Sequence, residues 1–293
     1  MSTVLSIRYY GGLIRNEEVN KISARVVGYS FPHFQRAIDK MVMYELGYSM
    51  AKYSTLPPAE HDRADLVFDH LEDGSIVFPF SSRFKEAGAF LNEALARPFA
   101  IGGEIGDQQV ISAATRLDVV KANIAVGAYD ETEFIVTQEQ IDKNRWELAK
   151  VGIARDVNTG LTVVRQEGGD SGIEFIPSDD DLERYDFNVP NATNFNRVVS
   201  RSEILDPWIY RGQITAIKST GNGRSNRYQA TFRDARYNSE HVLYIASEDD
   251  KEDLRPYFLN GVDVDIWACP FARYGIHDYM RGNLLFAGLY EEL

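Results

Sequence analysis

The chain has very little cysteine and no long apolar run, and both absences narrow its class. Among 293 residues there is a single cysteine, Cys269, so no internal disulfide can form. This usage is typical of proteins kept in a reducing compartment. No run of about 18 apolar residues occurs, and the first ten residues lack the basic start and apolar stretch of a secretory signal. We therefore expect a cytoplasmic protein with no membrane partner.

Metal-binding patterns are also missing. No histidine lies three or four residues from another histidine or from Cys269, although structural zinc sites depend on such spacings. The acidic run Asp179 to Asp181 lacks the spacing and the glycine of a calcium-binding EF-hand loop. We predict neither a metal nor another cofactor. The five histidines are His33, His61, His70, His241 and His277.

The short motifs that suggest catalysis lack their context. Gly169-Asp170-Ser171-Gly172 matches the sequence around the nucleophile of chymotrypsin-like proteases, which also need a suitably placed histidine and two preceding β-barrels. No histidine here has that setting, and the four residues are typical of a turn. The glycine-rich stretch 102–106 fits neither a dinucleotide-binding nor a phosphate-binding loop. We therefore assign no catalytic residue.

The chain does contain enough apolar material for about two folded domains, because 44% of its residues are hydrophobic and 12% are aromatic. Its net charge of −13 is unevenly spread, with −11 on residues 1–195 and −2 on residues 196–293. An acidic surface repels phosphate backbones. Generic nucleic-acid binding is therefore not expected in the N-terminal region.

The pattern of apolar residues changes near Asn196. Before it, we predict strands at 4–10, 21–29, 160–164 and 173–176, a hairpin over 64–80 that turns at Asp73-Gly74, and helices at 31–48 (capped by Ser30), 81–96, 107–126 and 137–151. After it, we predict strands at 208–218, 227–234, 242–246, 262–271 and 283–290, with one short helix at 248–258. The predicted fold class is α+β. A mixed α/β head domain (1–190) precedes a small OB-like or SH3-like β-barrel (196–293).

The clearest functional hint is a basic and aromatic stretch in the predicted barrel. Between Arg211 and Arg236 the only acidic residue is Asp234, and tyrosines and a phenylalanine are interleaved with the basic residues. OB-type barrels hold single-stranded nucleic acids in basic grooves lined by stacking aromatics. Alternatively, the aromatics form the core and the basic residues simply face water. The candidate binding residues are Arg211, Lys218, Arg224, Arg227, Tyr228, Arg233 and Arg236.

Three short segments resemble an uncharacterised family of bacterial and phage-encoded proteins. They are Ile7-Arg8-Tyr9-Tyr10-Gly11-Gly12, Asp73-Gly74-Ser75-Ile76 and Phe258-Leu259-Asn260-Gly261-Val262-Asp263-Val264. The resemblance implies an α/β head followed by a small barrel, and a prophage or antiviral defence setting. It implies no active site.

We favour a binding or adaptor protein with a protein partner and no catalytic activity, because catalytic signatures are missing and 16 tyrosines are present. Single-stranded nucleic-acid binding through the barrel is the first alternative. An enzyme of unrecognised type is the second, and an acidic decoy that mimics DNA is the third.

Overall fold

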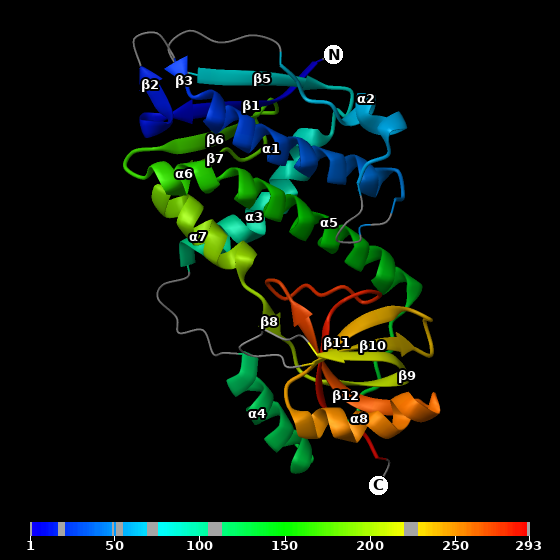
Figure 1. The fold of residues 1–293 in the computed structure, drawn as a ribbon. Coiled ribbons are helices and arrows are strands. Elements are labelled where there is room, and N and C mark those ends of the chain that lie inside the picture. The colour runs from blue at the N-terminus through cyan, green and yellow to red at the C-terminus, as the bar shows by residue number, and fades with distance from the viewer. Residues whose placement is uncertain are drawn as a thin grey trace. The chain divides into compact units, whose positions relative to one another are not determined.

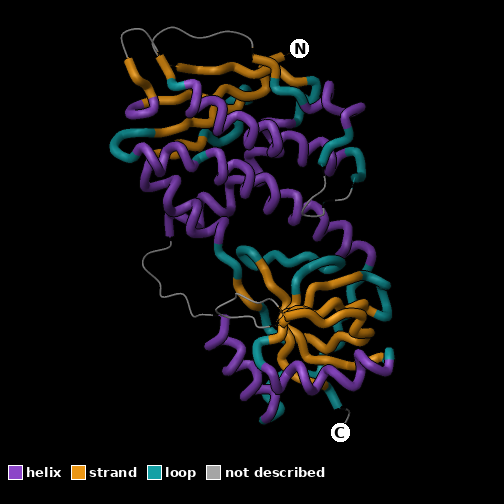
Figure 2. The backbone as a smooth tube through the Cα atoms, viewed as in Figure 1, coloured by secondary structure: helices purple, strands orange, loops and turns teal. Residues whose placement is uncertain are grey.

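The protein is described from a computed structural model, which covers residues 2–16, 21–48, 50, 55–68, 76–104, 113–219 and 228–291 (Figures 1 and 2). The chain divides into two compact units. Unit 1 comprises Met1–Asp107 and Arg145–Arg201, and unit 2 comprises Gln108–Asn144 and Ser202–Leu293. The sequence-based domain boundaries, 1–190 and 196–293, stay a prediction.

Unit 1 is built on a five-stranded antiparallel sheet with the strand order β4-β5-β1-β6-β7. Its strands are β1 (Ser2–Tyr10), β4 (Val67–Phe68), β5 (Ile76–Ser82), β6 (Gly172–Pro177) and β7 (Tyr185–Asn188). A short separate pair consists of β2 (Ile14–Asn16) and β3 (Lys21–Ile22). The β4–β5 pairing confirms two strands of the predicted hairpin, and its turn at Asp73-Gly74 lies outside the described residues.

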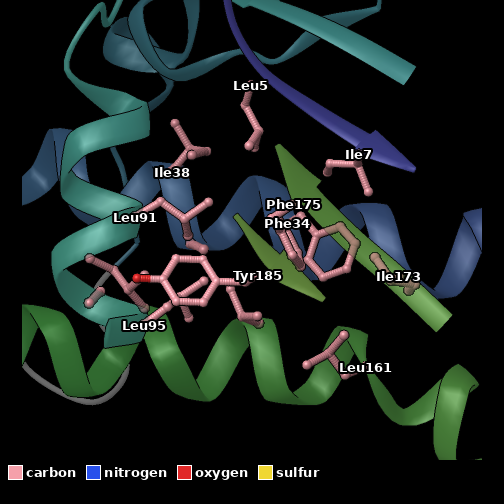
Figure 3. Close-up of a cluster of buried hydrophobic side chains, with 14 of the residues drawn as sticks. Leu5, Ile7, Phe34, Ile38, Leu91, Leu95, Leu161, Ile173, Phe175 and Tyr185 are labelled. Carbon is pink, nitrogen blue, oxygen red and sulfur yellow. The ribbon is translucent and has the colours of Figure 1, made fainter. Parts of the chain in front are cut away.

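The helices of unit 1 pack on one face of this sheet. They are α1 (Ala24–Glu45), α2 (His61–Ala64), α3 (Ala87–Glu104), α5 (Gln138–Gly160), α6 (Thr162–Glu167) and α7 (Val189–Ser200), with 3₁₀ turns at η1 (Gly11–Leu13) and η3 (Pro58–Glu60). Figure 3 shows the resulting core, in which Phe34 of α1 and Phe175 of β6 lie together. Their ring centroids are 4.9 Å apart in an edge-to-face arrangement. This geometry suits the quadrupoles of aromatic rings.

Helix α1 starts earlier than the sequence suggested. The prediction placed a strand over 21–29 and a helix cap at Ser30, but Ser23 is the N-cap, and its side chain accepts a hydrogen bond from the backbone N–H of Arg25. Ser30 is instead buried within the helix, where its hydroxyl donates to the carbonyl of Val26 at 2.9 Å. The amphipathic stripe continues N-terminally to Val26, so packing of that face on the sheet overrides the local strand signal. Similarly, the strand predicted at 160–164 is wrong, because Thr162 begins α6.

Unit 2 contains a closed barrel of five strands: β9 (Trp208–Ser219), β10 (Tyr228–Asp234), β11 (Glu240–Ile245), β12 (Asp263–Ala272) and β13 (Leu284–Leu289). Strands β9, β10 and β11 pair in sequence, β12 returns beside β9, and β13 fits between β12 and β11. The β11–β13 pairing is parallel, and the others in the barrel are antiparallel. Numbered one to five along the chain, the strands close the barrel in the order 1-2-3-5-4-1. The predicted fold class is therefore confirmed.

Two helices and a short strand of unit 2 pack around the barrel: α4 (Ala113–Ala125), α8 (Glu248–Asn260) and β8 (Glu203–Ile204). Helix α8 connects the third and fourth strands, begins at the N-cap Ser247 and ends at Gly261, which has the left-handed backbone that glycine tolerates. Its Leu254 is fully buried in the interior cluster of the barrel. Helix α4 covers part of the outer surface of β12 and β13, where Leu117 and Val120 pack in one cluster with Trp267 and Leu285.

An extended segment before α5 also belongs to the barrel. The backbone N–H of Phe134 donates to the carbonyl of Ile209 at 2.8 Å, and the N–H of Ile209 donates to Thr132 at 3.0 Å. The ring of Phe134 stacks on Tyr210 with a centroid separation of 4.7 Å, and on Trp208 at 5.3 Å. A residue outside the five strands thus supplies a ring to the barrel core.

Candidate binding face of the barrel

The side chains of β9, β10 and β11 alternate between the barrel interior and an outer face. On β10, Ala230 and Phe232 are buried in the interior, so Gln229, Thr231 and Arg233 face outward. The outer positions line up in three rungs across the strands. They are Lys218–Gln229–Tyr244, Ala216–Thr231–Val242 and Gln213–Arg233–Glu240. We call these nine residues the barrel face.

The middle of the barrel face is uncharged. Val242 is 38% exposed, Ala216 is exposed, and Thr231 between them is half-buried. On the neighbouring rung the ring of Tyr244 makes an edge-to-face contact with Phe271, at a centroid separation of 5.4 Å. This contact fixes the orientation of the tyrosine without burying it completely. The face therefore presents an apolar centre and a fixed aromatic ring.

Three of the candidate arginines form ion pairs with carboxylates. Arg233 contacts Glu240 on the adjacent strand with an N–O distance of 2.9 Å, and Arg236 contacts Glu133 at the same distance. Arg211 lies 3.9 Å from Asp265. All three arginine side chains are well exposed. Their positive charges are locally balanced, which weakens their attraction for a polyanion.

The other candidate binding residues do not share the surroundings of these three arginines. Lys218 is exposed at one end of the barrel face. Tyr228 is half-buried at the start of β10, where its hydroxyl donates to Glu248 and the Lys251 ammonium lies 4.7 Å from the centre of its ring. This tyrosine contacts α8 and is not one of the nine residues of the barrel face. Arg224 and Arg227 lie outside the described residues.

A buried carboxylate shapes the turn that carries Arg236. Asp234 is 3% exposed, and its Oδ1 accepts hydrogen bonds from the backbone N–H groups of Arg236 at 2.8 Å and Tyr237 at 2.7 Å. The hydroxyl of Tyr237 in turn donates to the carbonyl of Val136 at 3.0 Å. The only acid of the basic stretch therefore has a structural role, since it holds a turn.

Unit 2 buries two histidines, His241 and His277. His241 places Nδ1 2.9 Å from the carbonyl of Gly282 and Nε2 3.0 Å from the hydroxyl of Ser239, and burial lowers its pKa. Burial, with a smaller contribution from His241, lowers the pKa of His277 to about 4. Both rings are therefore neutral at pH 7. Among the described residues, no group of three or more His, Cys, Asp or Glu side chains could hold a metal ion.

Ser171 of the protease-like motif is fully buried and cannot meet a substrate in this structure. It packs against Gly12, where an added methyl group would come within 2.6 Å of the serine Oγ. The neighbouring Asp170 accepts a hydrogen bond from the backbone N–H of Gly12 at 2.9 Å. The motif therefore lies in the turn between α6 and β6, as the turn interpretation predicted, and packs against the 3₁₀ turn that follows β1.

Sequence reasoning missed the uncharged part of the barrel face and the carboxylates that pair with the arginines. Alternation within each strand could have indicated that Thr231, Val242 and Tyr244 face outward. The partners Glu133 and Asp265 are distant in the chain, so no local pattern could have identified them.

No family model, curated protein or solved structure matches this chain. The five-strand barrel agrees with the architecture that the family resemblance implied, and membership of that family stays a prediction. Within the described part of the chain, none of the helices combines the length and apolar character needed to cross a membrane.

Proposed function

We propose that the protein is a non-catalytic binding protein that contacts a protein partner through the barrel face. The observation that carries this proposal is the uncharged centre of the face, where an exposed Val242 lies between Thr231 and the Tyr244 rung. Protein interfaces are depleted of charge at their centre and enriched in tyrosine. In OB-folds the face of the second and third strands binds oligonucleotides and oligosaccharides, so analogy of fold supports the choice of this face as a ligand surface.

The experiment compares binding partners captured by three forms of the protein. Val242→Glu places a charge at the centre of the barrel face, while Val262→Glu makes the same change at a 46% exposed position before β12. Each form is crosslinked in native lysate. We expect the wild type and Val262→Glu to capture the same proteins, and Val242→Glu to capture none of them. Identical sets of proteins from all three forms would contradict the proposal. Circular dichroism of both variants checks that each remains folded.

Single-stranded nucleic acid is the second candidate ligand. It is favoured by the Lys218–Gln229–Tyr244 rung, which combines a cation and an aromatic ring beside the connection that carries Arg224 and Arg227. Backbone cations and stacked bases are the usual basis of such binding. A bacterial or phage defence setting stays a prediction for either ligand.

Fluorescence anisotropy with single-stranded DNA and RNA, at low and physiological salt, tests this candidate. Replacing Lys218, Arg224 and Arg227 with alanine removes up to three phosphate contacts, so the slope of log K against log salt should fall by about 2. Arg233→Ala should change the slope less, because Glu240 already balances that arginine. A lack of saturable binding by the wild type at low salt would eliminate nucleic acid as the ligand.

A further inference from the structure

An apolar pocket of about 190 Å³ lies in unit 1, between the first half of α1 and the sheet. Its floor consists of Ile7, Phe34 and Phe80, which are 0%, 2% and 3% exposed. Figure 3 labels two of these residues, Ile7 of β1 and Phe34 of α1. The residues around its mouth are more exposed: Phe31, Pro32, Gln35 and Leu66. The pocket is therefore open to solvent at this mouth and closed by buried apolar side chains at its floor.

Aromatic contacts hold the walls in place, both within the lining and with rings behind it. The ring of Phe31 makes edge-to-face contacts with Phe78 and Phe80 at centroid separations of 4.9 and 5.2 Å. Phe34 is similarly held by Phe175. Pro32 lies inside α1 and removes one backbone hydrogen bond of the helix, which disfavours a straight helix at this point. These constraints keep the aromatic rings from collapsing into the space.

Among the described residues that line the pocket, Gln35 alone has a polar side chain, and the protein satisfies its hydrogen bonds. The amide nitrogen of Gln35 donates to Asp39 and to the carbonyl of Ala64, both at 2.9 Å. Its amide oxygen accepts from the backbone N–H of Leu66, also at 2.9 Å. A polar or charged ligand would therefore lose its hydrogen bonds with water and gain few from these residues.

We propose that this pocket is a binding site for a small neutral aromatic molecule of one ring. An engineered apolar cavity of about 150 Å³ stays dry and binds benzene, so the size is suitable. The rings of Phe31, Phe34 and Phe80 offer edges and faces for contact with an aromatic guest. Filling the pocket also restores dispersion contacts that the lining atoms otherwise lack. The site lies in unit 1, so it is separate from the barrel face and does not depend on the function proposed for it.

Toluene and phenol are matched probes, because they have the same number of heavy atoms and differ in one hydroxyl group. We expect toluene to raise the melting temperature of the wild type with a saturable concentration dependence. It should also shift the NMR signals of the Ile7 and Leu66 methyl groups. Phenol should bind at least about fivefold more weakly, because its buried hydroxyl would lack a partner. No saturable effect of toluene, or methyl shifts confined to other residues, would overturn the proposal.

A variant with a larger side chain at the mouth of the pocket tests whether toluene binds there. Leu66→Trp adds bulk at a half-buried lining residue, while Val67→Trp adds the same bulk one residue later, at a side chain that is 42% exposed and does not line the pocket. Toluene binding should be lost in the first variant and kept in the second. Equal binding by both would contradict the assignment. If Leu66→Trp fails to fold, the methyl shifts of the wild type decide the question.

Discussion

The two units bury polar groups of different kinds. Among the described residues of unit 1, the buried polar ones are uncharged and do not titrate near neutral pH: Ser30, Ser81, Ser82, Asn158 and Ser171. Those of unit 2 are acids and histidines: Asp234, His241, Asp250 and His277. Burial lowers the pKa of both histidines, so we expect unit 2 to be the more sensitive of the two units to acid.

The contrast follows from the architecture of each unit. In unit 1 an open sheet packs on helices, and buried hydroxyls such as that of Ser30 bond to a nearby backbone carbonyl or a tyrosine. In unit 2 the barrel is closed by long-range connections, and two of its buried ionisable groups fix loops. Asp234 holds the turn after β10, and His241 binds the carbonyl of Gly282 before β13. These hydrogen bonds tie the connections to the strands of the barrel.

The largest expected effect is the loss of the Phe134 ring. Phe134→Ala removes a ring that is 5% exposed and contacts Trp208, Tyr210, Tyr237 and Tyr279. We expect the free energy of unfolding of unit 2 to fall by about 3–5 kcal/mol, which is typical of a buried phenylalanine. Hydrogen exchange should show loss of protection in β9 and β13, with less change in β1 and β5. Equal loss in both sheets would contradict a difference between the units.

Phe258→Ala is the matched control for this experiment. Phe258 lies on α8 of the same unit and is 36% exposed, so its truncation leaves a smaller cavity. Its effect should stay below about 1 kcal/mol. A large effect there would mean that unit 2 is sensitive to any aromatic truncation.

Acid should destabilise unit 2 through His277. Burial lowers the pKa of this histidine to about 4, from 6.5 in the unfolded chain. Between these values the unfolded chain binds a proton that the folded barrel does not, so stability is complete above pH 6.5 and falls as the pH decreases towards 4. The loss attributable to His277 reaches about 3 kcal/mol near pH 4.

Urea denaturation of the wild type and His277→Phe at several pH values measures this contribution. The variant keeps an aromatic ring beside Trp208 and Tyr279 but cannot titrate. Its stability should decrease less than that of the wild type between pH 6.5 and pH 4. Parallel pH profiles would show that this histidine is not a source of acid sensitivity.

A smaller effect is expected at a close helix approach in unit 1. Gly160 of α5 faces Phe34, and an added methyl group would overlap the phenylalanine ring. Gly160→Ala should therefore cost about 1–3 kcal/mol through overpacking. Gly28→Ala in α1 has open space around the new methyl group and should stabilise the helix by about 0.5–1 kcal/mol. Thermal or urea unfolding of both variants checks the opposite signs.

The sequence allowed much of the fold to be predicted where a local pattern decides it. Alternating apolar residues indicated β9, β10 and β12, and the run of strands correctly predicted a small barrel. The way in which the barrel closes could not be predicted from the sequence, because the parallel pairing of Leu243 with Leu284 joins strands that are distant in the chain. The contribution of Phe134 was missed for the same reason.

The candidate site was less predictable than the fold. Strand alternation places Arg211 and Arg233 on the outside, but their charge balance depends on Asp265 and Glu240 across the sheet. The register between neighbouring strands determines which carboxylate faces each arginine. A local sequence pattern does not fix this register, because it depends on how all the strands of the barrel pair. The pocket in unit 1 could not be predicted from the sequence either, because it arises from the way α1 packs over β1 and β5.

The smallest expected effect concerns two ion pairs, one in each unit. Arg233 and Glu240 are 47% and 57% exposed, so solvent screens their attraction, and their coupling energy should be about 0.2–1 kcal/mol. Lys40 and Asp156 in unit 1 are 26% and 16% exposed, and Lys40 also donates to the carbonyl of Gly152 at 3.1 Å. Double-mutant cycles with Arg233→Ala and Glu240→Ala, and with Lys40→Met and Asp156→Asn, measure both couplings. We expect a weaker and more salt-sensitive coupling on the barrel. A coupling above that of Lys40–Asp156 would show that Arg233 is held firmly by Glu240, and would remove this arginine from any site that needs a free positive charge.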